Sequence, residues 1–235
     1  FQQGTIVLLR SLHVLTTADL SNATFPFRTA RNIDIGIARA LCVRITYVGE
    51  LGYELYVPCE QAVQVYDQLL KAGKKHGLRH AGLRALGSLR MEKAYRDYGH
   101  DLDNTDNAFE TGLGFAVRLG KTDGFIGQKM AMKQNGATSH RKRLVQVLVN
   151  DPEPMLWHGE IVFHNDQPVG VVRSGSYGHT LGGAVGLAMI DGHDSGVSAK
   201  SISSGKWEIE IAGQRYQCTC SLSPLYDPKM VRIRA

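Results

Sequence analysis

The chain has 235 residues, a formal net charge of +5, 43% hydrophobic residues and 21% charged residues. This composition is typical of a globular protein that buries its own core. No apolar run approaches the roughly 18 residues of a membrane span, so no membrane partner is expected. Basic residues cluster at 71–79 and 140–143. Without a nucleic-acid-binding motif they indicate only solvated surface, and no nucleic acid is expected.

No metal site is predicted. The four cysteines contain no C-x-x-C pair, and the nine histidines lack metal-ligand spacing. The acidic run 101–107 begins like a calcium loop, but Asp106 stands where such a loop needs Gly, and Gly112 where it needs Glu. Cys218 and Cys220 are two residues apart, which places both side chains on one face of a strand. We expect them to be free cysteines that act as small apolar residues, and a reducing compartment is the default.

Strands are predicted over the first 60 residues. Residues 33–37, 41–48 and 53–57 alternate apolar and polar side chains, which is typical of strands with one buried face. The glycines of the segment 49–52 predict a turn that joins the last two strands into a hairpin.

Two helices are predicted next, over about 60–76 and 81–95. In the first, the apolar residues Val63, Tyr66 and Leu69 recur at helical spacing, and Gly77 suits the position just after the helix end. Strands followed by helices in this order favour an α+β layer, with helices on a mostly antiparallel sheet.

The sequence pattern changes after about residue 142. Six short alternating segments follow, separated by turn residues, and they predict a small all-β sandwich or barrel. They are 144–149, 160–163, 169–173, 185–190, 206–211 and 215–221. Residues 133–139 are the best linker candidate. We therefore expect an α+β domain over 1–135 and a β-barrel domain over 141–235.

The predicted hairpin carries the strongest local signal for a site. Glu54 lies among Tyr47, Tyr53 and Tyr56, and composition alone favours an exposed glutamate. A carboxylate flanked by aromatic rings can accept two N–H donors of a flat heterocycle that stacks beside the rings. The chain has no G-x-S-x-G, H-E-x-x-H or Walker loop, and no G-x-G-x-x-G that would hold a flavin or nicotinamide.

The run YVGELGYELYVP at 47–58 resembles the corresponding hairpin of sarcosine and dimethylglycine dehydrogenases and, more distantly, of the glycine-cleavage T-protein, an aminomethyltransferase. Similar segments follow in the same order along the chain, so the resemblance covers about residues 18–235. They are AGLRALGSLRMEKAYRDYGHDLDN at 81–104, ETGLGFAVRL at 110–119, FIGQKM at 125–130, GEIVFHNDQPVGVVRSGSYG at 159–178 and PLYDP at 224–228.

This resemblance implies a fold and an activity. It implies a T-protein-like folate-binding domain, incomplete at its N-terminus, followed by a β-barrel. Family members oxidise an N-methyl amine with a covalent FAD in an upstream domain. Tetrahydrofolate in the C-terminal region then captures the one-carbon unit as 5,10-methylenetetrahydrofolate. The expected partners are therefore folate and a one-carbon donor from the flavin site. The implied compartment is the mitochondrial matrix in a eukaryote and otherwise the cytoplasm.

The resemblance also implies site residues. Glu54 would hold the pterin, Tyr47 and Tyr56 would flank it, and Phe115 stands where relatives carry an aromatic near the folate. The T-protein arginine that binds the folate glutamate falls at Leu86 here, which leaves Arg84, two residues earlier, as the candidate. The Asp that assists folate chemistry lies upstream in the family, so no catalytic residue is assigned.

Two alternatives stay open at this stage. One is a non-catalytic regulatory subunit on the same scaffold, as in the regulatory subunit of pyruvate dehydrogenase phosphatase. The other is a T-protein-like aminomethyltransferase that acts with a lipoyl carrier. The intact hairpin with Glu54 favours a working folate slot over the regulatory subunit. The amino-acid sequence of residues 81–104 resembles the dehydrogenases and so favours them over the aminomethyltransferase. The oligomeric state is left open.

Overall fold

The computed structural model describes residues 2–136 and 140–234, with side chains described from residue 9 onward. Within it the chain forms two compact units. The first unit is Phe1–Leu89 with Lys229–Ala235, and the second unit is Arg90–Pro228. The division into domains over 1–135 and 141–235 stays a prediction.

The first unit is built on a three-stranded antiparallel sheet. Its strands, in the spatial order β1-β2-β3, are β1 (Ala30–Ile35), β2 (Ala38–Val43) and β3 (Glu54–Tyr56). A tight turn at Gly36, whose φ is +60°, joins β1 to β2. The positive φ is a conformation that glycine adopts without steric cost.

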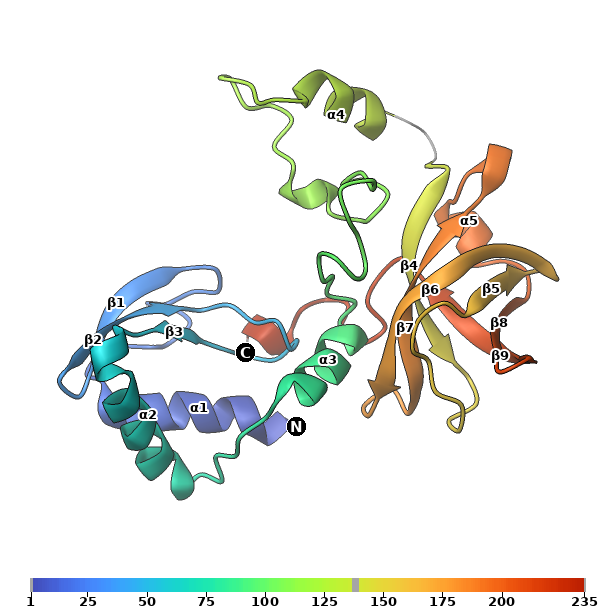
Figure 1. The fold of residues 1–235 in the computed structure, drawn as a ribbon. Helices are drawn as coiled ribbons and strands as arrows, with labels where there is room; N and C mark the ends of the chain where they lie inside the picture. Colours follow the sequence, from blue (N-terminus) through green and yellow to red (C-terminus); the bar gives the residue numbers. More distant parts are fainter. Residues whose placement is uncertain (1, 137–139, 235) are drawn as a thin grey trace. The chain divides into compact units, whose positions relative to one another are not determined.

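One face of this sheet is covered by two helices, α1 (Gln2–Leu15) and α2 (Cys59–Lys74), which lie side by side (Figure 1). Alternate residues of the strands point into the core between sheet and helices, where they meet Leu12 of α1 and Val65 of α2. The sheet residues of this core are Ile33, Ile35, Ala38, Ala40 and Cys42.

Three expectations for this unit need correction. Residues 2–15, included in the region predicted as strands, form α1, because its Leu12 completes the core at helical spacing with Leu9 and Leu15. The predicted hairpin pairs as expected, but its turn is wrong. The strand β2 ends at Val43, and residues 44–53 form a loop before β3.

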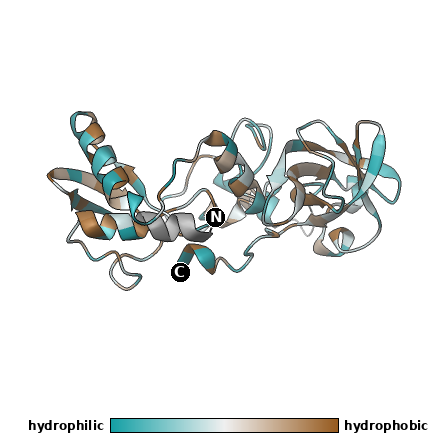
Figure 2. Ribbon diagram, turned by 90° about the horizontal axis from the view of Figure 1, so that it is seen from below, coloured by the Kyte–Doolittle hydropathy of each residue, from teal (hydrophilic) through white to brown (hydrophobic). Residues whose placement is uncertain are grey.

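The third correction concerns which side of α2 is buried. The helix itself is confirmed, and Figure 2 shows hydrophobic and hydrophilic residues alternating along it. However, Val65 is buried while Val63 is 72% exposed. Tyr66 is turned outward, where its hydroxyl lies 2.9 Å from His80 Nε2. Apolar residues thus lie on two sides of α2, and the side that contains Val65 packs against the core.

The end of α2 has Gly77 in the position that the sequence predicts for it. The Leu78 N–H donates to the Gly73 carbonyl (3.0 Å) and the Gly77 N–H to the Lys74 carbonyl (3.2 Å). This pair of bonds is the Schellman motif, in which Gly77, with φ +77°, occupies the left-handed position. The next helix, α3 (Leu83–Glu92), is shorter than the predicted 81–95 because the chain turns at Ala94, whose φ is +52°.

The second unit contains a closed six-stranded barrel, so the predicted α+β fold with a following barrel is confirmed. All six predicted strands are present, and neighbours pair in the order β4-β7-β6-β5-β8-β9, with every pair antiparallel. The strands are β4 (Lys142–Val149), β5 (Ile161–His164), β6 (Gln167–Gly178), β7 (Gly183–Asp191), β8 (Trp207–Ile211) and β9 (Gln214–Ser221). Short helices complete the unit: η1 (Gly114–Ala116), α4 (Gln128–Asn135), η2 (His193–Ser195) and α5 (Ala199–Ile202), while η3 (Arg232–Arg234) belongs to the first unit.

Strand β7 is buried on both faces. Ala184, Ala188 and Ile190 point into the barrel core, to which Cys218 and its neighbour Cys220 also belong. Leu187 and Met189, which alternate with these residues along β7, point out of the barrel. They pack with Met91 at the end of α3 in a second cluster. A strand covered from both sides loses the polar alternation that marks the other strands.

The predicted linker 133–139 is only partly tested. Residues 133–135 are the last turn of α4 rather than linker, and residues 137–139 lie outside the described residues. Among the described residues no helix is both long enough and apolar enough to cross a membrane.

Gln146 of β4 connects the end of α3 to the barrel. Its Nε2 donates to the carbonyls of Met91 (2.7 Å) and Glu92 (3.0 Å), and its Oε1 accepts from the Leu225 N–H (2.6 Å). The side chain of Glu92 extends this connection, because its Oε1 accepts from the backbone N–H groups of Thr180 (2.6 Å) and Leu181 (3.0 Å). Both side chains are almost fully buried, so these bonds are shielded from water.

We expect Gln146→Met to lower the free energy of unfolding by about 2 kcal/mol, because it leaves the Leu225 N–H unsatisfied and removes two further bonds. Urea denaturation would measure the loss. Gln217→Met, on the exposed side of β9, is the matched control and should change the stability by less than about 0.5 kcal/mol. Equal losses in the two variants would contradict the assigned role of Gln146.

A second connection is the ion pair between Arg173 of β6 and Asp106 of the acidic loop. The guanidinium donates to both carboxylate oxygens, Nη1 to Oδ2 at 2.5 Å and Nη2 to Oδ1 at 3.0 Å. These bonds are the main reason why the pKa of Asp106 lies below its ordinary value of 3.8. The folded state therefore favours the charged carboxylate, and this stabilisation is lost as the pH falls through the lowered pKa.

Asp106→Asn should lower the stability at pH 7 by about 1 kcal/mol, the scale of a partly exposed bidentate pair. The difference from wild type should hold between pH 7 and pH 5 and shrink below pH 3.8, where the carboxyl of Asp106 takes up a proton in the unfolded chain before it does so in the folded chain. Denaturation curves at several pH values would test this. A difference that persists unchanged to pH 3 would show that the charge of Asp106 is not its source.

Candidate functional site

The face of the three-stranded sheet opposite the helices carries the candidate site. Here the register places Ala30, Val43 and Glu54 in one row across the strands. Asn32, Leu41 and Tyr56 form the next row. We call these six residues the open face. All of them are exposed or half-exposed, because the alternation of β2 sends Cys42 between the two rows to the opposite, buried side.

Glu54 and Tyr56 form a hydrogen-bonded pair on the open face. They are two residues apart on β3, so their side chains point the same way, and the Tyr56 hydroxyl donates to Glu54 Oε2 at 2.7 Å. The bond to the carboxylate raises the pKa of Tyr56 above its ordinary value of 10. The phenol thus keeps its proton and remains a donor across the physiological range.

The pair has the chemistry of a receptor for a flat, polar heterocycle. A carboxylate can accept about four hydrogen bonds, and among the described residues Tyr56 is the donor to Glu54, through Oε2. Oε1 is thus available to N–H donors of a ligand. Beside the carboxylate, the Tyr56 ring and the Leu41 side chain are 57% and 40% exposed and offer apolar surface against which a ring can stack.

The other predicted site residues lie elsewhere. Tyr47 is half-buried in the loop 44–53 that leads to β3, and Arg84 is exposed in the first turn of α3. Phe115, which is 76% exposed, lies in η1 of the second unit, whereas the other four belong to the first unit. The structure thus brings Glu54 and Tyr56 together, and the site roles of all five residues stay predictions.

Sequence reasoning missed the neighbours of Glu54 on the open face. Val43, Leu41 and Asn32 carry no motif, and their place beside Glu54 and Tyr56 follows only from the strand register. The alternation within 41–48 indicates which residues share a face, but not which residues of β3 lie opposite them.

The described residues fit folate and flavin differently. The open face offers an acceptor and an apolar surface, which suits a pterin ring. A dinucleotide such as FAD is commonly held by a parallel βαβ unit, but the strands described here pair antiparallel, so these residues do not fit that mode of flavin binding. Over the described part of the chain, no three His, Cys, Asp or Glu side chains lie together as metal ligands would.

Two family models match the chain. The model described as "GCVT N-terminal domain" matches residues 9–121, and "Glycine cleavage T-protein C-terminal barrel domain" matches residues 142–227. The second range contains the six strands of the barrel. The structure is also similar to the crystal structure of glycine cleavage system aminomethyltransferase T from Bartonella henselae. The TM-score is 0.65 at 22% identity, over 83% of this chain and 50% of that one, which shows the shared fold.

Curated relatives match over nearly the whole chain. The chain is 40% identical over 220 residues to 4-methylaminobutanoate oxidase (formaldehyde-forming) of Paenarthrobacter nicotinovorans, covering 94% of this chain and 26% of the relative. It is 35% identical over 224 residues to mitochondrial sarcosine dehydrogenase of Homo sapiens, covering 95% of this chain and 24% of the relative. The chain thus spans about a quarter of the length of these relatives.

The raised pKa of Tyr56 gives a direct test of the geometry on the open face. In Glu54→Ala the pKa of Tyr56 should fall toward the ordinary value of 10, because the hydrogen bond and the neighbouring negative charge are both removed. NMR titration of ring-labelled tyrosine would follow it. Glu60→Ala, in the first turn of α2, is the control and should leave the titration unchanged. If Tyr56 titrates identically in wild type and Glu54→Ala, the two side chains are not paired in solution.

Proposed function

Because the chain belongs to the glycine cleavage T-protein family, we propose that it is the tetrahydrofolate-binding part of an FAD-dependent dehydrogenase of the sarcosine and dimethylglycine type. In this proposal the one-carbon unit released by oxidative N-demethylation is captured as 5,10-methylenetetrahydrofolate. The flavin would be held by another part of a longer protein, since the chain spans only about a quarter of such relatives.

The observation that carries the proposal is the Glu54–Tyr56 pair. A pterin ring presents an amino group and a ring N–H side by side, and the Glu54 carboxylate is an acceptor of matching shape. Tyr56 holds that carboxylate through Oε2, which limits its rotation before a ligand arrives and lowers the entropy lost on binding. The half-exposed side chains of Val43 and Leu41 would lie under the ring.

The remaining residues have supporting roles in the proposal. Tyr47 would flank the pterin on the side of the loop 44–53, Phe115 would take the place of the aromatic that relatives carry near the folate, and Arg84 would bind the glutamate carboxylates. The chain's own residues bind and orient the folate, and none of them is assigned the proton transfer. In a eukaryote the protein would act in the mitochondrial matrix, and otherwise in the cytoplasm, with no nucleic-acid or membrane partner.

Calorimetric titration of the chain with 5-formyltetrahydrofolate tests the proposal. Wild type should bind in the micromolar range, and Glu54→Ala should weaken binding by at least about 1.5 kcal/mol, the value of a hydrogen bond to a charged group. Tyr56→Phe should weaken binding less, because the carboxylate stays but is no longer held.

Glu60→Ala is the matched control, since it removes an exposed carboxylate of the same unit away from the open face. Its affinity should equal that of wild type. Folded wild-type chain that does not bind 5-formyltetrahydrofolate would sink the proposal for this chain and favour the regulatory use of the scaffold. Equal weakening by Glu54→Ala and Glu60→Ala would instead show that only net charge matters.

A further inference from the structure

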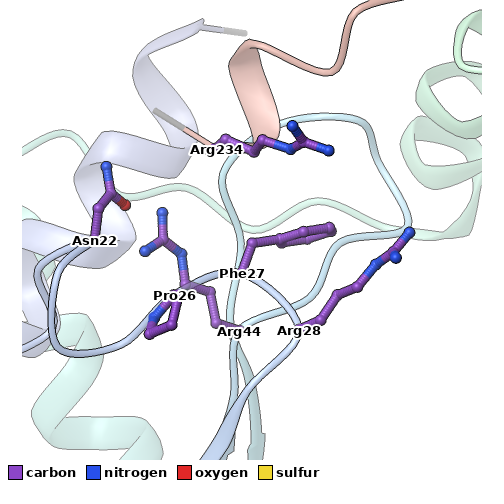
Figure 3. Close-up of a pocket in the computed structure, with 6 residues that line it drawn as sticks. All are labelled: Asn22, Pro26, Phe27, Arg28, Arg44 and Arg234. Atoms are coloured by element: carbon purple, nitrogen blue, oxygen red, sulfur yellow. The ribbon is translucent and has the colours of Figure 1, made fainter.

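The first unit contains a pocket of about 410 Å³ that the folate proposal does not use. It is lined by Asn22, Pro26, Phe27, Arg28, Arg44 and Arg234 (Figure 3). The residues come from the segment before β1, from the residue that follows β2, and from η3 near the C-terminus. Three of the six are arginines and none is acidic, so the pocket is strongly positive.

This pocket lies away from the open face. Val43 shares the open face with Glu54, and Arg44, the next residue, points to the opposite side of the sheet, where its side chain is only 1% exposed. The Arg44 Nη1 donates to the Phe25 carbonyl at 2.7 Å, which fixes the guanidinium at the pocket wall.

A distortion of the backbone beside the pocket determines where Arg28 lies. The Arg28 N–H donates to the Arg44 carbonyl and the Arg44 N–H donates to the Thr29 carbonyl, both at 2.9 Å. Two residues of one segment thus oppose one residue of the other, which is a β-bulge at the end of the β1–β2 ladder. Its first position favours glycine, because φ there is positive, yet Arg28 occupies it with φ +70°.

A non-glycine residue in this conformation is strained, and such strain concentrates at ligand sites. Here the strain has a visible effect, because the bulge directs Arg28 into the pocket lining. Its guanidinium carbon lies 5.6 Å from the centre of the Phe27 ring, in a cation–π contact. Figure 3 shows the Phe27 ring in the middle of the view, with Arg28, Arg44 and Arg234 around it.

Within the described part of the chain, neither Arg28 nor Arg234 forms an ion pair with a carboxylate. Both side chains are exposed, and both line the pocket. Guanidinium groups are planar donors that match the two oxygens of a carboxylate. Phe27 and Pro26 add apolar wall, which suits a ligand with a carbon skeleton better than a bare inorganic anion.

We propose that this pocket is a binding site for a small organic di- or tricarboxylate, held by Arg28 and Arg234 above the Phe27 ring. The volume of the pocket falls in the range of small-molecule sites. The site is separate from the Glu54–Tyr56 pair and does not depend on folate binding there.

Titration of the chain with glutarate at constant ionic strength tests the proposal, followed by calorimetry or by NMR of the arginine side chains. Wild type should show saturable binding with a Kd at or below about 1 mM. Arg28→Gly should weaken binding about tenfold, the effect of losing one charged donor. Because glycine relieves the strain at φ +70°, the same variant should keep or raise the melting temperature, which separates the loss of binding from loss of the fold.

Arg39→Gln, an exposed β2 arginine outside the pocket lining, is the control for net charge, and Glu54→Gln is the control for the open face. Both should bind glutarate as wild type does. Absence of saturable binding, or equal weakening by Arg28→Gly and Arg39→Gln, would overturn the proposal. Inorganic phosphate that binds as tightly as glutarate would overturn the assignment to organic carboxylates.

Discussion

The antiparallel pairing of β2 with both of its neighbours is the constraint on which the first unit depends. Because successive side chains of a strand alternate, this register assigns every residue of the sheet to one of two faces. Cys42 and its alternates form the core with α1 and α2, while Val43 and Leu41 lie beside Glu54 and Tyr56. A shift of one residue would bury Glu54 and expose the core. The core therefore holds the candidate site in place from the opposite face of the sheet.

The same register explains why one short stretch of sequence serves two different surfaces. Val43 and Arg44 are neighbours in the chain, but one lies on the open face and the other at the arginine-lined pocket. The two surfaces also differ in charge and in backbone strain. The open face presents a carboxylate on regular strands, and the pocket presents guanidinium groups beside a bulge.

Sequence patterns predicted the elements well where one face of each is buried. Five of the barrel strands and α2 follow from their periodicity, and β7, which is buried on both faces, was also predicted. The aromatic neighbours of Glu54 marked it as a candidate, and its role in a site stays a prediction. The patterns did not reveal α1, whose apolar residues also suit a strand, nor the loop 44–53, because the residues after Val43 continue to alternate. The pocket arginines could not be predicted either. Arg28 and Arg234 are more than 200 residues apart in the chain, and no local rule places arginine at a bulge position that favours glycine.

The two sheets differ in how their hydrogen bonding ends. The barrel closes, so each of its six strands has a partner on both sides, whereas the first unit ends in the edge strands β1 and β3. Edge strands can recruit further strands and so promote aggregation. Here β3 has only three residues, and β1 carries the charged side chains of Arg31 and Asp34, both of which discourage such pairing. Substitutions that make β1 apolar would therefore favour edge-to-edge association of the first unit while leaving the barrel intact.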